Sequence, residues 1–136
     1  MSAPPDWRAT LDPARKSWLD TANDSACDFP IQNLPFGIFS DAKQPARRAG
    51  VALGDQIVDL AALARAGLVT LPAGAGNVFD APSLNAFIAL GRDAWRGVRV
   101  QLSALFARDT ARLRDDAALR VQALVPQRGA TLHLPV

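Results

Sequence analysis

The chain has 136 residues, 49% hydrophobic and 21% charged, with a net charge of +2 and a mean hydropathy of +0.06; this excludes a wholly disordered chain and fits one globular domain. It has one cysteine and one histidine, and all 13 acidic residues are aspartates, which argues against a self-contained active site built from Glu and His. No apolar run reaches the ~18 residues of a membrane span. No secretory signal is visible, so we expect a cytoplasmic protein.

The start of the chain, residues 1–27, is predicted to be a loose lead-in with one short helix. Asp12 followed by Pro13 is typical of a helix start, because Asp caps free N–H groups and Pro fits the first turn. The domain itself is expected over residues 28–136.

A hairpin is the clearest pattern in the first half. A strand is expected over Phe36–Phe39, and the polar residues 41–49 are predicted to form a surface loop. Two apolar runs over 50–60 then flank Gly54-Asp55. This predicts a two-residue type II′ turn, which needs φ > 0 at its first central residue.

Helices are predicted to dominate the second half. The expected elements are helices over 61–66 (capped by Asp59), 80–91 (capped by Asp80), 92–108 and 117–124 (capped by Asp115-Asp116), and a strand over 131–134. The helix over 92–108 is amphipathic: its apolar face carries Trp95, Val98, Leu102, Leu105 and Phe106, and its polar face carries Arg92, Arg96, Arg99 and Ser103. Strands, then helices, then one more strand predict an α+β fold.

Two short motifs suggest chemistry but have plainer interpretations. Gly74 and Gly76 form a G-x-G without the third glycine or a strong preceding strand, so we expect a loop and not a dinucleotide site. Asp115 and Asp116 have the composition of a metal clamp or an acid/base pair. Neighbouring aspartates at a helix start are more often caps.

The single histidine, His133, would need a nearby nucleophile to work as a catalytic base. Ser40, Ser83 and Cys27 are the candidates, and nothing in the sequence places them near it. We therefore expect a histidine with a structural role. The neighbouring Asp28 carboxylate disfavours a thiolate at Cys27, so a reactive thiol is not expected.

Charge is uneven along the chain: residues 1–91 carry 7 basic and 9 acidic groups, whereas residues 92–136 carry 8 basic and 4 acidic groups. A solvated helix face is the plain interpretation. The alternative is an interaction module whose basic half holds an acidic partner. No aromatic platform is interleaved with the arginines, so we expect no nucleic-acid binding.

Five ordered blocks within about residues 18–136 resemble the fumarylacetoacetase family. They are Asp28–Ser40, Gly50–Leu60, Phe79–Phe87 with Leu90-Gly91 and Ala94-Trp95, Arg112–Asp116, and Thr131–Pro135. The resemblance implies an SH3-like small β-barrel with attached helices. It also implies a homodimeric, cytosolic parent enzyme that hydrolyses 4-fumarylacetoacetate to fumarate and acetoacetate, the last step of tyrosine breakdown.

The resemblance implies that in that family Asp and Glu carboxylates hold Ca²⁺ or Mg²⁺ and that a His–Glu pair activates water. Those residues belong to a catalytic domain that follows the Leu-Pro stretch, and no position of this chain matches them. We therefore expect no catalytic, cofactor-binding or metal-binding residue here, and a structural domain whose partner is the catalytic domain. An exposed apolar patch is predicted near Leu132 and Leu134.

Overall fold

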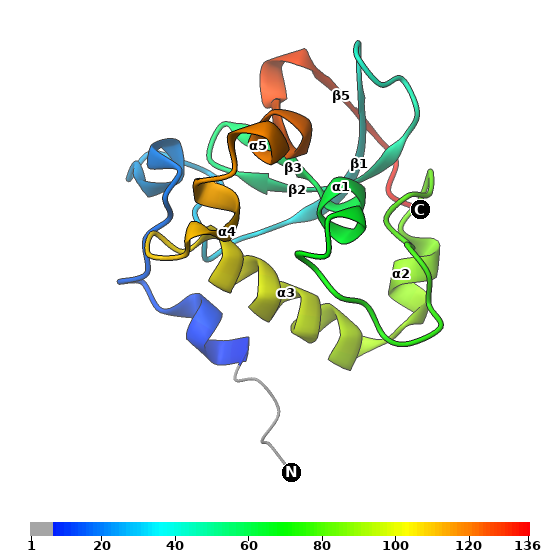
Figure 1. The fold of residues 1–136 in the computed structure, drawn as a ribbon, viewed down its shortest axis with the longest axis horizontal. Helices are drawn as coiled ribbons and strands as arrows, with labels where there is room; N and C mark the ends of the chain where they lie inside the picture. Colours follow the sequence, from blue (N-terminus) through cyan, green and yellow to red (C-terminus); the bar gives the residue numbers. More distant parts are fainter. Residues whose placement is uncertain (1–6) are drawn as a thin grey trace.

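The computed structural model describes residues 7–136 and contains one five-stranded antiparallel sheet with the strand order β4-β3-β2-β1-β5 (Figure 1). The strands are β1 (Phe36–Asp41), β2 (Arg48–Leu53), β3 (Gln56–Asp59), β4 (Leu124–Pro126) and β5 (Ala130–His133). The α-helices are α1 (Leu60–Arg65), α2 (Asn85–Ala89), α3 (Arg92–Phe106), α4 (Ala111–Arg114) and α5 (Ala117–Ala123). Three 3₁₀ helices complete the list: η1 (Trp7–Leu11), η2 (Asp20–Asn23) and η3 (Gln127–Gly129).

The predicted hairpin is confirmed as β2 and β3. Gly54 has a positive φ of 59°. Asp55 does not have a positive φ, because Leu34 is the one non-glycine residue with positive φ in the part of the chain that the structure describes. Positive φ at Gly54 but not at Asp55 fits the predicted type II′ turn. The turn fixes the register, so that Gly50 lies opposite Asp59.

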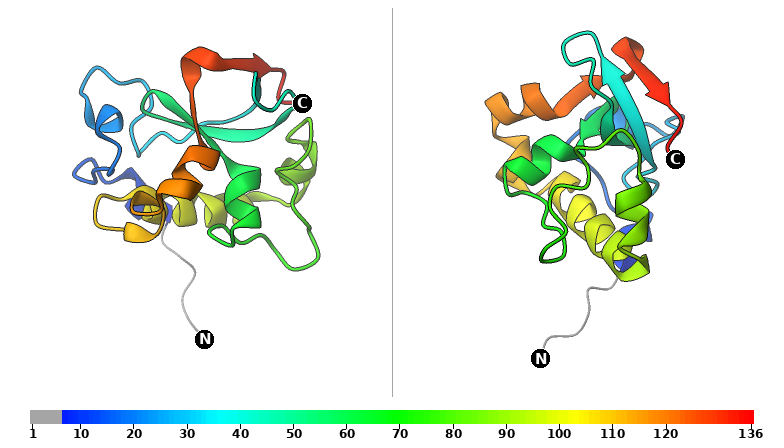
Figure 2. Two further views of the ribbon diagram at one scale, coloured as in Figure 1. Left: turned by 45° about the horizontal axis from the view of Figure 1, so that its top comes forward. Right: turned by 90° about the vertical axis from the view of Figure 1, so that its right-hand side faces the viewer.

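The main core lies between one face of the sheet and the helices, with α1 and α3 on the same side (Figure 2). Alternate residues of β2, Ala49, Val51 and Leu53, are fully buried on this side. Helix α3 contributes four of the five apolar residues predicted for its core face as fully buried side chains: Val98, Leu102, Leu105 and Phe106.

The other face of the sheet, called the second face here, carries a small separate cluster of Phe39, Ile57 and Val125. Strands β4 and β5 are the two edges of the sheet, yet only the three residues of η3 join them. The sheet must therefore curl so that its edges approach each other over the second face. The α+β prediction is confirmed, whereas the predicted SH3-like barrel is not, because β4 and β5 do not pair and the sheet stays open.

The helix predicted at Asp12-Pro13 is wrong. Turns occupy this position, where Asp12 Oδ1 accepts a hydrogen bond from the Ala14 N–H instead of capping a helix. Nor is the segment loose over its described part, because Trp18 Nε1 donates to the Leu105 carbonyl and Arg99 Nε donates to Thr10 Oγ1. The polar side of α3 is therefore covered by the N-terminal segment.

Other predicted boundaries also shift. The loop over 41–49 ends early, because Arg48 and Ala49 belong to β2. Asp80 does not cap a helix: α2 begins at Asn85, and Asp80 pairs at the surface with Arg65. The caps Asp59 and Asp116 are confirmed, since each accepts a backbone N–H at the start of its helix.

Candidate functional site

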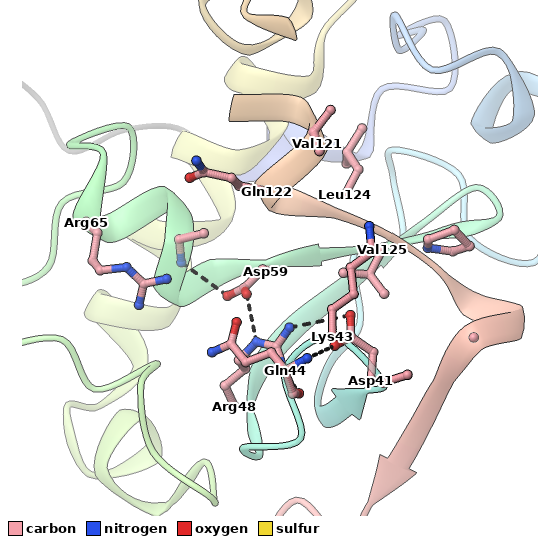
Figure 3. Close-up of a pocket in the computed structure, with 14 residues that line it drawn as sticks. Asp41, Lys43, Gln44, Arg48, Asp59, Arg65, Val121, Gln122, Leu124 and Val125 are labelled. Atoms are coloured by element: carbon pink, nitrogen blue, oxygen red, sulfur yellow. Dashed lines mark hydrogen bonds and ion pairs between the residues drawn. The ribbon is translucent and has the colours of Figure 1, made fainter. Parts of the chain in front are cut away.

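A buried arginine organises one end of the second face (Figure 3). The Nε of Arg48 donates to Asp59 Oδ2 at 2.7 Å, and its Nη2 lies 3.8 Å from Asp41 Oδ2. Its Nη1 donates to the carbonyls of Gln44 and Ala46, and its guanidinium carbon lies 4.3 Å from the ring centre of Phe39. The guanidinium nitrogens therefore bond to carboxylates and carbonyls, and the Phe39 ring packs against the group.

Asp59 uses both of its oxygens as well. Oδ2 accepts from Arg48, and Oδ1 accepts the Ala62 N–H at the start of α1. The Arg48 and Asp59 side chains are only 3% and 2% exposed, so breaking the pair would leave an uncompensated charge, at a cost of about 3–5 kcal/mol. The pair therefore joins β2, β3 and α1 and has no free acid or base to offer a substrate.

A cleft of about 560 Å³ opens beside this ion pair, between the 41–44 loop, α1 and α5. Lys43, Arg65 and Gln122 lie at its rim, and Val121 of α5 is 73% exposed beside it. The cleft has the size of a small-molecule site. The charged groups on its floor, Arg48, Asp41 and Asp59, are paired with one another, so none of these three is free to act as an acid or a base.

The opposite end of the second face is apolar. A hollow of about 230 Å³, called the apolar groove here, is lined by Phe29, Pro35, Phe36, Gly37, Phe39, Gly50, Ala52, Ile57 and Leu132. The small residues Gly37, Gly50 and Ala52 form its floor in β1 and β2, and Leu132 of β5 stands 74% exposed at its edge. The prediction of exposed Leu132 and Leu134 is confirmed, since Leu134 is 83% exposed.

The structure brings together two residues that the sequence left apart. Ser40 Oγ of β1 and His133 Nε2 of β5 lie 2.7 Å apart, because the two strands pair along this edge. A catalytic Ser–His pair needs a third group that orients the imidazole and donors that stabilise an oxyanion. No carboxylate bonds to His133 within the described residues 7–136, so the contact acts as a cross-strand hydrogen bond.

The remaining candidates have local structural roles. Asp116 caps α5 through the Leu119 N–H, and the hydrogen bond from Arg114 to Asp115 lowers the pKa of Asp115. Cys27 Sγ accepts from the Phe29 N–H, and Ser83 Oγ accepts from the Asn85 N–H, whereas the hydrogen-bond partner of His133 is Ser40.

Gly74 and Gly76 lie in the loop before α2 with φ 83° and 68°, as expected for a loop and not for a strand-to-helix phosphate turn. Across residues 7–136, no group of three or more His, Cys, Asp or Glu side chains could hold a metal ion. No helix in that same range is long and apolar enough to cross a membrane.

Arginines of the basic half are used inside the molecule. Arg96 lies over the Trp7 ring at 4.7 Å, and Arg120 lies over the Trp18 ring at the same distance. Arg99 donates to Thr10 and to two carbonyls, and burial lowers its pKa. Part of the basic surface is thus committed to holding the N-terminal segment, and the alternative of an acidic-partner module finds no support.

Comparison with known proteins identifies relatives along most of the chain. A family model described as "Fumarylacetoacetase N-terminal" matches residues 32–135. The chain is similar to the fumarylacetoacetases of Mus musculus (48% identical over 121 residues), Caenorhabditis elegans (46% over 120) and Homo sapiens (45% over 119). Each match covers 88% of this chain but only 28% of the relative.

The matched range includes every strand of the sheet, the Arg48–Asp59 pair and the edge where β5 meets β1. The described residues 7–136 contain no metal-ligand cluster, and the Mus musculus relative is more than three times longer than this chain. Because the family model matches residues 32–135, well over half of the chain, the chain belongs to the fumarylacetoacetase N-terminal family.

Proposed function

We propose that this chain is the N-terminal domain of a fumarylacetoacetase, and that it supports the catalytic part of that enzyme without taking part in the chemistry. The carrying observation is the match that covers 88% of this chain and 28% of its relatives. The proposed parent activity is hydrolysis of a carbon–carbon bond in 4-fumarylacetoacetate, giving fumarate and acetoacetate in tyrosine breakdown.

The chemistry of the residues supports this division of labour. Hydrolysis of a diketo acid requires a group that takes a proton from water and a group that stabilises the developing enolate. Here the buried carboxylates at the cleft are paired with Arg48, and the chain contains no glutamate. These residues do not fit a divalent cation, so in this proposal the ligands for Ca²⁺ or Mg²⁺ belong to the part of the relatives that this chain does not match.

Three finer properties belong to the same proposal. The meander of strands and the short β4–η3–β5 connection support an SH3-like barrel left partly open. A homodimeric parent enzyme and a cytoplasmic location follow from the family resemblance. The division into a lead-in over 1–27 and a domain over 28–136 also remains a prediction.

The test is a chimera in which this chain replaces the matched segment of the Mus musculus fumarylacetoacetase. We expect the chimera to consume 4-fumarylacetoacetate, which is measured as the loss of the diketone absorbance of the substrate. The isolated chain should leave the substrate unchanged with or without Ca²⁺ or Mg²⁺. Hydrolysis by the isolated chain would overturn the proposal. So would a folded chimera that has no activity.

A further inference from the structure

The apolar groove exposes apolar surface, whereas the charged groups at the other end of the second face are paired with one another. Every strand residue that lines it, apart from Phe36 at the start of β1, points to the second face: Gly37 and Phe39 in β1, Gly50 and Ala52 in β2, Ile57 in β3 and Leu132 in β5. Its lining is almost wholly apolar and has no charged residue. A hollow of this composition receives apolar side chains.

The floor of the groove is built to stay hollow. A Cβ added at Gly37 would meet no atom within 4 Å, so the space above this residue is empty. At Gly50 a Cβ would lie 2.6 Å from Ile57 Cγ2 and 2.8 Å from the Phe39 ring, so this position must be glycine for these two side chains to pack over it. Gly50 thus permits Phe39 and Ile57 to pack against the sheet on the second face, and Gly37 leaves the space above it open.

The C-terminal residues lie next to the groove. Leu132 lines the groove edge, and the following residues Leu134 and Val136 are 83% and 71% exposed. The Pro135 carbonyl accepts from the Leu84 N–H at 2.7 Å, which holds this end of the chain against the segment before α2. Phe36, which also lines the groove, packs against Phe87 of α2 as a tilted ring pair with its centroids 5.2 Å apart. The C-terminal end of the chain lies beside α2 as well (Figure 1).

The size of the groove argues for a tethered occupant. At about 230 Å³ it is below the usual range of small-molecule pockets. Its nine lining residues are also far fewer than the roughly 20–30 residues per partner of a stable interface between separate proteins. A segment linked to the same polypeptide faces an effective concentration near the millimolar range, so a small apolar contact is enough to hold it. The curated relatives provide such a segment, because 72% of their length lies outside the match.

We infer that the apolar groove is the docking site for an apolar segment of the catalytic part of fumarylacetoacetase, inserted between Gly37 and Leu132. This rests on the proposed function, since the occupant belongs to the enzyme assigned there. The cleft beside Arg48 then remains outside the contact.

The experiment uses the active chimera and measures amide hydrogen exchange in β1 and β5, compared with the isolated chain. We expect docking to protect these amides. Gly37→Leu fills the hollow and Leu132→Ser removes its edge, so each should raise exchange in the chimera about tenfold or more. Val121→Ser is the matched control, because Val121 is 73% exposed, like Leu132, but lies on α5 beside the cleft.

The outcomes separate the two proposals. An active, folded chimera in which both groove variants exchange like Val121→Ser overturns the groove inference and leaves the proposed function standing. A folded but inactive chimera without protection overturns the proposed function and, with it, the occupant assigned to the groove. Concentration-dependent dimers of the isolated chain that Leu132→Ser abolishes would assign the groove to a second copy and overturn the inference as well.

Discussion

The two ends of the second face are built from the same strands but are closed in opposite ways. At one end, Arg48 is 2% exposed and is enclosed by Asp41, Asp59, Phe39 and two carbonyls. At the other end, glycines and Ala52 leave a hollow whose edge residue Leu132 is 74% exposed. The first end satisfies its own polar groups, whereas the second leaves apolar surface without a cover.

The difference shows where a supporting domain keeps its own stability and where it can meet a partner. A buried ion pair contributes to the fold mainly because each charge prevents the other from being left alone. An exposed apolar hollow contributes little to the isolated fold and gains only when it is covered. The four predictions below test this separation, from the largest expected effect to the smallest.

Asp59→Ala should break the closed end. It leaves the Arg48 cation buried without its partner and removes the cap of α1, so we expect a loss of about 3–5 kcal/mol in the free energy of unfolding, measured by urea denaturation. The double variant Arg48→Met/Asp59→Ala should lose less than the sum of the single variants. Additive losses would show that the two side chains do not act as a pair.

Gly50→Ala and Gly37→Ala compare the floor of the groove with the space above it. Alanine at Gly50 must displace Ile57 or Phe39, which should cost about 1–3 kcal/mol in thermal or urea unfolding. Alanine at Gly37 meets nothing and should be neutral or stabilise the strand by about 0.5–1 kcal/mol. Equal effects at both positions would contradict the described shape of the groove.

Leu132→Ser should leave the isolated chain almost unchanged, within about 0.5 kcal/mol, because its side chain is already 74% in solvent. Val121→Ser, equally exposed at the other end, should behave the same way in urea unfolding. A loss above about 1.5 kcal/mol for Leu132→Ser alone would place the edge of the groove in the core of the isolated domain.

Thr21→Val should have the smallest effect on stability. It removes a hydrogen bond to Asp55 in the turn between β2 and β3. Hydrogen bonds from Gln56 and Thr21 lower the pKa of Asp55, so its contribution to stability is present above the ordinary carboxyl pKa of about 3.9 and is lost as the pH falls through the lowered value. The variant should raise the pKa of Asp55, as followed by NMR titration. Thr131→Val, in the exposed edge strand, is the control that should leave it unchanged.

The sequence predicts well those elements whose causes are local. Gly54-Asp55 determines both the turn and the register of β2 and β3, and the spacing of apolar residues identifies α3. The same register places Gly50 opposite Asp59, and therefore Arg48 diagonally across from it on the same face. Counting back from the turn would have found the ion pair, but the polar context of residues 41–49 suggested a loop.

Elements that depend on distant partners could not be predicted in this way. Strand β4 is only three residues long and ends in Pro126, so it has no periodicity of its own and exists because β3 pairs with it. Arg99 and Ser103 follow the pattern of a solvated helix face, yet the N-terminal segment covers them through Thr10 and Arg15. The groove, too, arises only when four strands bring their residues together on one face, with the small residues coming from β1 and β2.

The pairing of the first strand with the last has a consequence for synthesis of the protein. Ser40 and His133, which join β1 to β5, are 93 positions apart in the chain. At about 5–20 residues per second a ribosome needs roughly 5–20 s to make that stretch, and during this time the outer edge of β1 emerges without its neighbour. Bare strand edges recruit other strands, so a nascent chain of this domain is most prone to aggregate in the interval before its final strand arrives.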